Sequence, residues 1–275
     1  MPPVPAPDPG RTDSYLICAT PRTGSSLLCG LLDSAGVAGH PESWFRRQDE
    51  QAFAARWGIA DPLDGAFDYA SYLRAATAAG STANGVFAAR VMWGTMDEVT
   101  ARLAPAYPGH AGSAVGLLSA AFGRTRFVYL RRGDVVAQAV SLLRAEQTGV
   151  WLETADERQE PTAQPGFDFG QVRDLVRQIE DDNAAWEAWF TAEGIRPHGV
   201  LYEELDADPV GIASGVLSFL RLDLPASREI TIRHKRLADE LNARWIETYR
   251  LHQARERQGR PSGAGAGAGA GGCGG

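Results

Sequence analysis

The sequence predicts an α/β domain built on a central parallel β-sheet that is flanked by helices on both faces. Short apolar runs alternate with amphipathic helical patterns along most of the chain, which is typical of such sheets. Two of the runs lead through a tight turn directly into a helix. The length of 275 residues and an apolar content of 44% allow one sizeable core, with no composition break that would indicate a second domain.

Both ends of the chain have compositions that do not favour a packed structure. Residues 1–13 contain five prolines, and residues 259–275 are dominated by a Gly/Ala repeat. Such segments offer little apolar surface to bury and are typical of flexible chain. We therefore expect a disordered N-terminus at 1–13, a folded unit at 14–258 and a disordered tail at 259–275.

Within this unit, the order of strands and helices follows from hydrophobic periodicity. Four short apolar runs are expected to be strands: 14–19, 85–93, 126–130 and 199–205. Five amphipathic segments are expected to be helices: 24–36, 133–149, 168–193, and the regions near 208–220 and 236–257. Ligands of parallel sheets bind at the carboxyl ends of the strands, so the site is sought there.

Charge and cysteine content limit the function classes. The net charge of −7 argues against nucleic-acid binding. The three cysteines, at positions 18, 29 and 273, have no zinc-site spacing. There is no export signal at the N-terminus and no apolar stretch near the roughly 18 residues that would span a bilayer. We therefore expect a cytoplasmic protein with no membrane span.

The turn after the first strand, in SYLICATPRTGSSLL, has the composition of an anion-binding loop. Gly24 permits close backbone approach, Ser25 and Ser26 add hydroxyls, and the unpaired N–H groups at the helix start point at a ligand. Arg22 adds a fork for a phosphate or sulfate oxygen. The alternative is an ordinary strand–helix turn whose serines only cap the helix.

A second strand–turn–helix layout occurs about 110 residues later, in YLRRGDVVAQAVSLLRA. Arg131 and Arg132 stand at the end of the strand, Asp134 is placed to cap the helix, and Ser141 lies two turns into it. Arg132 and Ser141 are candidates to hold a second phosphate. The alternative is a surface arginine pair and a serine bonded to its own helix backbone.

Together these two arms resemble the sulfotransferase superfamily. The segments AGVAGHPESWF, NGVFAARVMW, WEAWF and DELNARWIETY resemble the bacterial trehalose 2-sulfotransferase family in particular. The resemblance implies a P-loop-like sulfotransferase fold and the co-substrate 3'-phosphoadenosine 5'-phosphosulfate (PAPS), released as adenosine 3',5'-bisphosphate, with no metal. It also implies a homodimer and a small carbohydrate acceptor, such as trehalose, a related sugar or a glycolipid precursor.

The resemblance assigns roles to residues of the two arms. TPRTGSS becomes the 5'-phosphosulfate loop, with Arg22, Thr23, Gly24, Ser25 and Ser26 as donor-binding residues. RRGDVVAQAVS becomes the 3'-phosphate element, which contains Arg132 and Ser141.

Three residues are candidates to take part in the chemistry. Glu42, in HPESWF, is the candidate general base and matches the catalytic glutamate of the family. Without the resemblance, a solvated acid in a loop is the favoured interpretation of this residue. His40 is a competing base, because imidazole titrates in the right range. Arg22 is the candidate for stabilising charge on the leaving phosphate oxygen.

Further side chains near these motifs are candidates for acceptor binding, because sugar sites combine aromatic faces with polar donors. They are His40, Trp44, Phe45, Arg90 and Trp93.

Two other functions remain open from the residues alone. A small-molecule kinase would require a loop lysine and a magnesium-binding acid, and neither is present in the two arms. A nucleotide-binding module without catalysis is the second alternative, against which the presence of Glu42 and Arg22 argues.

Overall fold

The computed structural model describes residues 12–59, 68–151, 160–232 and 240–259. Four strands alternate with helices along this part of the chain. The strands are β1 (Ser14–Ala19), β2 (Phe87–Met92), β3 (Thr125–Arg131) and β4 (His198–Leu201). The helices are α1 (Ser25–Ala35), α2 (Arg47–Arg56), α3 (Tyr69–Ala79), α4 (Thr95–Leu103), η1 (Pro108–His110), α5 (Ala114–Phe122), α6 (Val135–Thr148), α7 (Phe169–Ala192), α8 (Tyr202–Ala207), α9 (Pro209–Leu220) and α10 (Glu240–Gly259).

The four strands form one parallel sheet with the order β2-β1-β3-β4. The last residue of β1, Ala19, pairs with Met92 of β2 and with Leu130 of β3, so these three strands end at the same edge. The chain runs outward from β1 to β2 on one side and from β3 to β4 on the other. The crevice between the β1 and β3 ends is therefore the topological switch point, where ligands of open α/β sheets bind.

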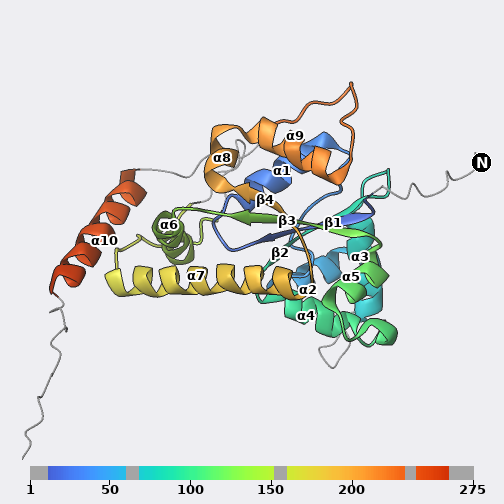
Figure 1. Cartoon of the computed structure of the whole chain (residues 1–275), viewed down its shortest axis with the longest axis horizontal. Helices are drawn as coiled ribbons and strands as arrows, with labels where there is room; N and C mark the ends of the chain where they lie inside the picture. Colours follow the sequence, from blue (N-terminus) through green and yellow to red (C-terminus); the bar gives the residue numbers. More distant parts are fainter. Residues whose placement is uncertain (1–11, 60–67, 152–159, 233–239, 260–275) are drawn as a thin grey trace, which may run out of the picture.

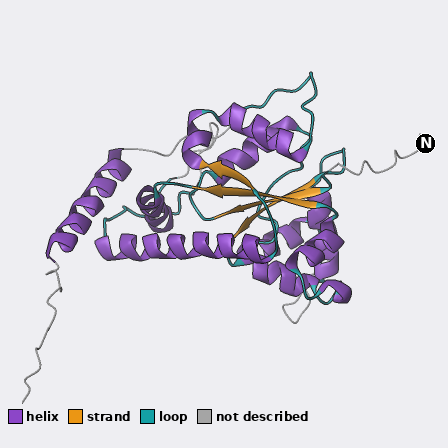
Figure 2. Ribbon diagram, in the orientation of Figure 1, coloured by secondary structure: helices purple, strands orange, loops and turns teal. Residues whose placement is uncertain are grey.

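Helices cover both faces of the sheet, as Figures 1 and 2 show. Tyr15, Ile17 and Ala19 of β1 pack with α1 and α9 on one face. Leu16 and Cys18 point to the other face, where they join a core made with α3, α4, α5 and the end of α7. This alternation follows from the two-residue period of a strand buried on both sides. The expected fold class is confirmed.

The last part of the chain packs beside the sheet. Helices α6, α7 and α10 share a third apolar cluster, in which Trp245 and Tyr249 of α10 are buried. Figure 1 shows α10 at the end of the molecule, next to α6 and α7. No helix in the described part of the chain is both long and apolar enough to cross a membrane.

One expected strand boundary was wrong. The strand expected at 199–205 ends at Leu201, and Tyr202 begins the short helix α8. Acidic residues Glu203 and Glu204 occupy the first turn of this helix, where they suit its positive end.

The expected disordered ends lie almost entirely outside the described residues. At the N-terminal side, the buried Thr12 hydroxyl donates to the Leu220 carbonyl, and the Asp13 amide donates to the Arg124 carbonyl. These two residues are therefore tied to the ends of α9 and α5.

Candidate active site

The loop after β1 has a backbone that few residues adopt. Arg22 has a φ of 67° and Gly24 a φ of 81°, both in the left-handed region. A Cβ atom on Gly24 would lie 2.7 Å from Cδ2 of Tyr202. Gly24 is therefore required twice, by its conformation and by the close approach of α8.

The carbonyl groups of this loop are bonded from inside the protein. The Ala19 carbonyl accepts from the Trp186 indole at 3.0 Å, the Thr20 carbonyl from the Thr23 hydroxyl at 2.9 Å, and the Pro21 carbonyl from the Gln138 amide at 2.7 Å. Thr23 is fully buried and acts as an internal brace of the loop. The partial negative charges of these peptides thus point into the protein.

The helix that follows presents unpaired N–H groups at its start. Gly24 is the N-cap of α1, and no side chain caps the helix. The hydroxyls of Ser25 and Ser26 are instead within hydrogen-bond distance of the Arg90 guanidinium. The alternative that these serines cap the helix does not hold, and the helix start remains available to an anion.

The second arm contacts the first through a hydrogen bond between side chains. Arg22 donates from Nε to the Ser141 hydroxyl at 3.0 Å, and it also donates to the Trp151 carbonyl. Ser141 lies on α6, so this bond joins the loop after β1 to the helix after β3. Burial, and then the positive charge of Arg132, lower the pKa of the Arg22 guanidinium. A guanidinium nevertheless remains charged in proteins, so positive charge is concentrated at the switch point.

Arg132 lies over the Tyr202 ring, with its guanidinium carbon 4.4 Å from the ring centroid. Its Nε atom is buried and has no hydrogen-bond partner among the described residues. The neighbouring Arg131 instead forms an exposed pair with Glu187. Of the two arginines at this strand end, Arg132 is therefore the one with a buried donor that has no partner among the described residues.

The turn between β3 and α6 is held by a carboxylate from α8. Glu203 accepts hydrogen bonds from the backbone N–H groups of Gly133 and Asp134 at 3.1 and 3.2 Å. Burial alone would raise the pKa of Glu203, but these bonds and the charge of Arg132 outweigh it, and the pKa is lowered. Asp134 caps α6 as expected, by accepting from the Ala137 amide at 3.0 Å.

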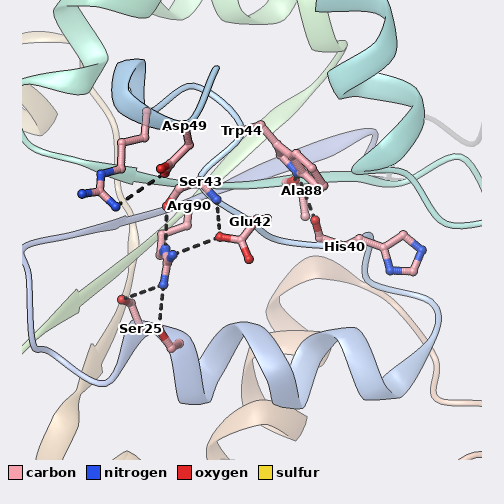
Figure 3. A network of polar contacts seen from close by, with 10 residues as sticks. Ser25, His40, Glu42, Ser43, Trp44, Asp49, Ala88 and Arg90 are labelled. Atoms are coloured by element: carbon pink, nitrogen blue, oxygen red, sulfur yellow. Dashed lines mark hydrogen bonds and ion pairs between the residues drawn. The ribbon is translucent and has the colours of Figure 1, made fainter. Parts of the chain in front are cut away.

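Glu42 lies in a polar cluster in which Arg90 contacts four other side chains, two of them at the start of α1 (Figure 3). Arg90 donates to Glu42 Oε1 at 3.0 Å, to the Ser43 hydroxyl at 2.9 Å and to the Ser26 hydroxyl at 2.8 Å, with Ser25 Oγ at 3.5 Å. The Arg90 side chain is 16% exposed and that of Glu42 is 50% exposed. The Glu42 carboxylate can therefore be reached from solvent, while the less exposed Arg90 fixes its orientation.

The backbone places Glu42 next to β2. The Arg90 amide donates to the Glu42 carbonyl at 2.9 Å, and Glu42 forms an isolated parallel bridge with Ala89. The Ser43 amide donates to Glu42 Oε1 at 2.7 Å. Among the described residues, Oε2 of Glu42 makes no hydrogen bond, so one carboxylate oxygen can accept a proton from a ligand.

His40 is directed away from this cluster. Its Nδ1 lies 2.6 Å from Asp33 Oδ1, at the exposed end of α1. Figure 3 shows its ring pointing away from the Glu42 carboxylate. The geometry therefore favours Glu42 over His40 as the base beside the anion loop.

The three expected aromatic contacts have different surroundings. Trp44 and Phe45 are 7% and 1% exposed and belong to the hydrophobic core. The Trp44 indole donates to the carbonyls of His40 and Ala88, both at 3.1 Å. Trp44 therefore fixes the loop that contains Glu42. Trp93 is half-buried at the end of β2, where it packs edge-on against Trp186 at 5.0 Å.

Sequence reasoning missed Gln138, a fully buried residue that donates to Thr20 and Pro21 of the loop. A signal was present, because Gln138 and Ser141 are three residues apart and lie on one face of α6. Both side chains project from α6 and form hydrogen bonds with the loop after β1.

These features define a class of protein. A parallel sheet holds two arginine-bearing strand ends against one another at its switch point, and a carboxylate faces one of them. Such a site suits an anionic, nucleotide-like ligand and a second reactant that loses a proton. Within the described residues, His, Cys, Asp and Glu side chains form no group of three that could hold a metal ion.

Comparisons with known proteins identify the family. The family model of the Stf0 sulphotransferases matches residues 14–252. The chain is 29% identical to trehalose 2-sulfotransferase of Mycobacterium tuberculosis and 30% identical to that of Mycolicibacterium smegmatis, and each alignment covers 88% of this chain and 96% of the relative. This chain therefore belongs to the Stf0 sulphotransferase family, and it is a sulfotransferase. The resemblance inferred from the sequence is confirmed.

A solved structure is similar more remotely. The sulfotransferase domain of the Synechococcus PCC 7002 olefin synthase covers 89% of this chain and is itself covered to 97%, with 14% identity and a TM-score of 0.38.

Proposed function

We propose that this chain transfers a sulfuryl group from PAPS to a hydroxyl of a small carbohydrate, such as trehalose, a related sugar or a glycolipid precursor. The observation that carries the proposal is the contact between the two arms, made by Arg22 and Ser141 at 3.0 Å. It brings two sources of positive charge to one crevice, as a nucleotide with phosphates at both its 5' and 3' positions requires.

The residues present fit such a donor. The uncapped start of α1 and the Gly24 approach favour the 5'-phosphosulfate end. The unpaired, buried Nε of Arg132 and the Ser141 hydroxyl favour the 3'-phosphate end. Buried polar groups are normally hydrogen-bonded, so this guanidinium nitrogen has a donor that a phosphate oxygen could use.

Glu42 is the proposed general base. Its unbonded Oε2 accepts the proton of the acceptor hydroxyl while Oε1 remains held by Arg90 and the Ser43 amide. PAPS supplies the sulfuryl group, whose bond to the 5'-phosphate oxygen breaks as the bond to the acceptor oxygen forms. Arg22 stabilises the negative charge on the phosphate side, and the leaving phosphate needs no proton.

The acceptor is proposed from two supports. The relatives at 29% and 30% identity are named for trehalose. The half-exposed Glu42 carboxylate is also accessible from solvent, as an acceptor hydroxyl requires. Trp93, half-buried at the end of β2, is the proposed acceptor contact. Trp44 and Phe45 act from the core, and His40 faces Asp33.

A binding and transfer experiment tests the proposal. Adenosine 3',5'-bisphosphate without magnesium should raise the Tm of the protein, whereas ATP with magnesium should raise it less. Incubation with sulfur-labelled PAPS and a panel of sugars should give a labelled product that mass spectrometry identifies. Stabilisation only by ATP with magnesium would favour a kinase, and binding without transfer to any sugar would favour an inactive module. Either result would refute the proposal.

A further inference from the structure

We infer that Arg90 is a positioning residue that links the proposed base to the proposed donor loop, so that one guanidinium sets the geometry of both reactants. This inference rests on the proposed function and adds a role for a residue that sequence reasoning placed only among the acceptor contacts.

Arg90 and its hydrogen-bond partners belong to three separate parts of the fold. Arg90 itself lies on β2, Glu42 and Ser43 belong to the segment between α1 and α2, and Ser26 lies in the first turn of α1. Its three nitrogens each contact a different partner, with Nε on Ser43, one terminal nitrogen on Ser26 and the other on Glu42. The planar fork of a guanidinium fixes the angles between these contacts.

The contact with Ser26 determines how the serine can act. A hydroxyl has one proton to donate and two lone pairs to accept. Arg90 has no acceptor, so Ser26 Oγ must accept from it at 2.8 Å. The Ser26 proton is then left to point elsewhere, and an oxygen of an anion at the helix start is the partner that the loop geometry offers. Arg90 thus orients Ser26 as a donor.

The contact with Glu42 has the matching effect on the base. Oε1 is occupied by Arg90 and by the Ser43 amide, so the carboxylate plane is set and Oε2 is presented to solvent. Since the same guanidinium holds Ser26, the base and the donor loop keep a fixed relation. In-line transfer is sensitive to such alignment, where a displacement of about 1 Å costs roughly 100-fold in rate.

Low exposure supports a positioning role over direct acceptor contact. The Arg90 side chain is 16% exposed, and each of its nitrogens already has a partner in the protein. An acceptor hydroxyl would have to displace one of these partners. The geometry therefore places Arg90 behind the reacting groups.

Four variants test the inference: Arg90→Met, Arg90→Lys, Glu42→Gln and the double variant Glu42→Gln/Arg90→Met. Transfer from labelled PAPS to trehalose, or to the best sugar of the panel, gives kcat and the two KM values. Calorimetric titration with adenosine 3',5'-bisphosphate gives a binding constant that does not require turnover. Arg131→Met is the matched control, because Arg131 lies on β3, another strand of the sheet, and its exposed guanidinium pairs with Glu187 of helix α7.

Arg90→Met should lower kcat by roughly 100-fold, the cost of a displacement of about 1 Å between the reacting groups. It should weaken bisphosphate binding by about tenfold, as expected when Ser26 is no longer oriented toward the anion and one hydrogen bond is lost. Arg90→Lys keeps the charge but cannot reach three partners at once, so kcat should recover only in part. It also carries the test if the Met variant does not fold. The double variant should lose less than the product of the two single losses, because the part of the Arg90 effect that acts through Glu42 is already absent in Glu42→Gln.

Several results would overturn the role proposed for Arg90 and leave the proposed function intact. The first is an unchanged kcat or an unchanged bisphosphate affinity in Arg90→Met, and the second is full recovery of kcat in Arg90→Lys. The third is a loss of kcat in the double variant that equals the product of the two single losses. Unchanged binding would also count against the linkage if the wild-type chain proved inactive toward every sugar. Wild-type inactivity itself would count against the proposed function, so the two failures can be told apart.

Discussion

Replacing Gly24 with alanine should destabilise the protein more than the same change at a comparable glycine. An L-residue in the left-handed region costs about 1–2 kcal/mol. The new Cβ would also lie 2.7 Å from Tyr202 Cδ2, and overpacking of this kind costs about 1–3 kcal/mol. The expected loss in the free energy of unfolding is therefore about 2–5 kcal/mol.

Gly194 offers the matched control. It also has a positive φ, of 65°, but a Cβ there would meet no atom within 4 Å. Gly194→Ala should therefore lose only the backbone contribution of about 1–2 kcal/mol. The difference between the two variants, about 1–3 kcal/mol, corresponds to about 2–12 °C in Tm for a domain of this size.

The assay is thermal unfolding of both variants, repeated in a Tyr202→Ala background. Removal of the Tyr202 ring should abolish the excess loss at Gly24. Two results would refute the reasoning. One is that Gly24→Ala and Gly194→Ala unfold at the same temperature, and the other is that their difference in Tm is unchanged in the Tyr202→Ala background. In either case the close approach of α8 does not constrain the loop.

Three further predictions concern single side chains. Glu42→Gln should lower kcat at least about 100-fold with bisphosphate binding nearly unchanged, and near-normal turnover would remove Glu42 from the mechanism. Arg22→Ala should damage both binding and turnover, and a silent change would show that the loop is misassigned. The lowered pKa of Glu203 means that its stabilising effect is present above its usual value, near 4.5, and is lost as the pH falls through the folded value. Acid unfolding of Glu203→Gln should therefore show a smaller loss of stability below about pH 4.5 than the wild type, and identical acid profiles would contradict this.

Much of the site was predictable because it is local in sequence. The anion loop and the turn after β3 each lie within about a dozen consecutive residues, so their strand, turn and helix signals occur together. A parallel sheet predicts that the loop of Arg22 and the helix of Ser141 lie at the same edge of the sheet. The sequence does not predict that β1 and β3 are neighbours, and the hydrogen bond between Arg22 and Ser141 depends on this strand order.

Other features depend on tertiary packing that no local pattern carries. Helices α2 to α5 were not predicted, and α2 (RQDEQAFAAR) buries only Glu50 and Ala54, so its sequence has little apolar periodicity. Trp44 and Phe45 lie in a motif segment but turn into the core, because their neighbours there are the rings of Phe53, Trp57 and Phe122. An aromatic residue near a site cannot be assigned to a ligand without knowing which side of the chain it faces.

The inward bonding of the carbonyls of Ala19, Thr20 and Pro21 has a consequence for how this acidic protein attracts an anion. Because these dipoles are anchored by Trp186, Thr23 and Gln138, none of these three carbonyl groups can easily rotate to offer its oxygen to the ligand. The part of the attraction that comes from these fixed main-chain dipoles therefore does not depend on the hydroxyls of Ser25 and Ser26.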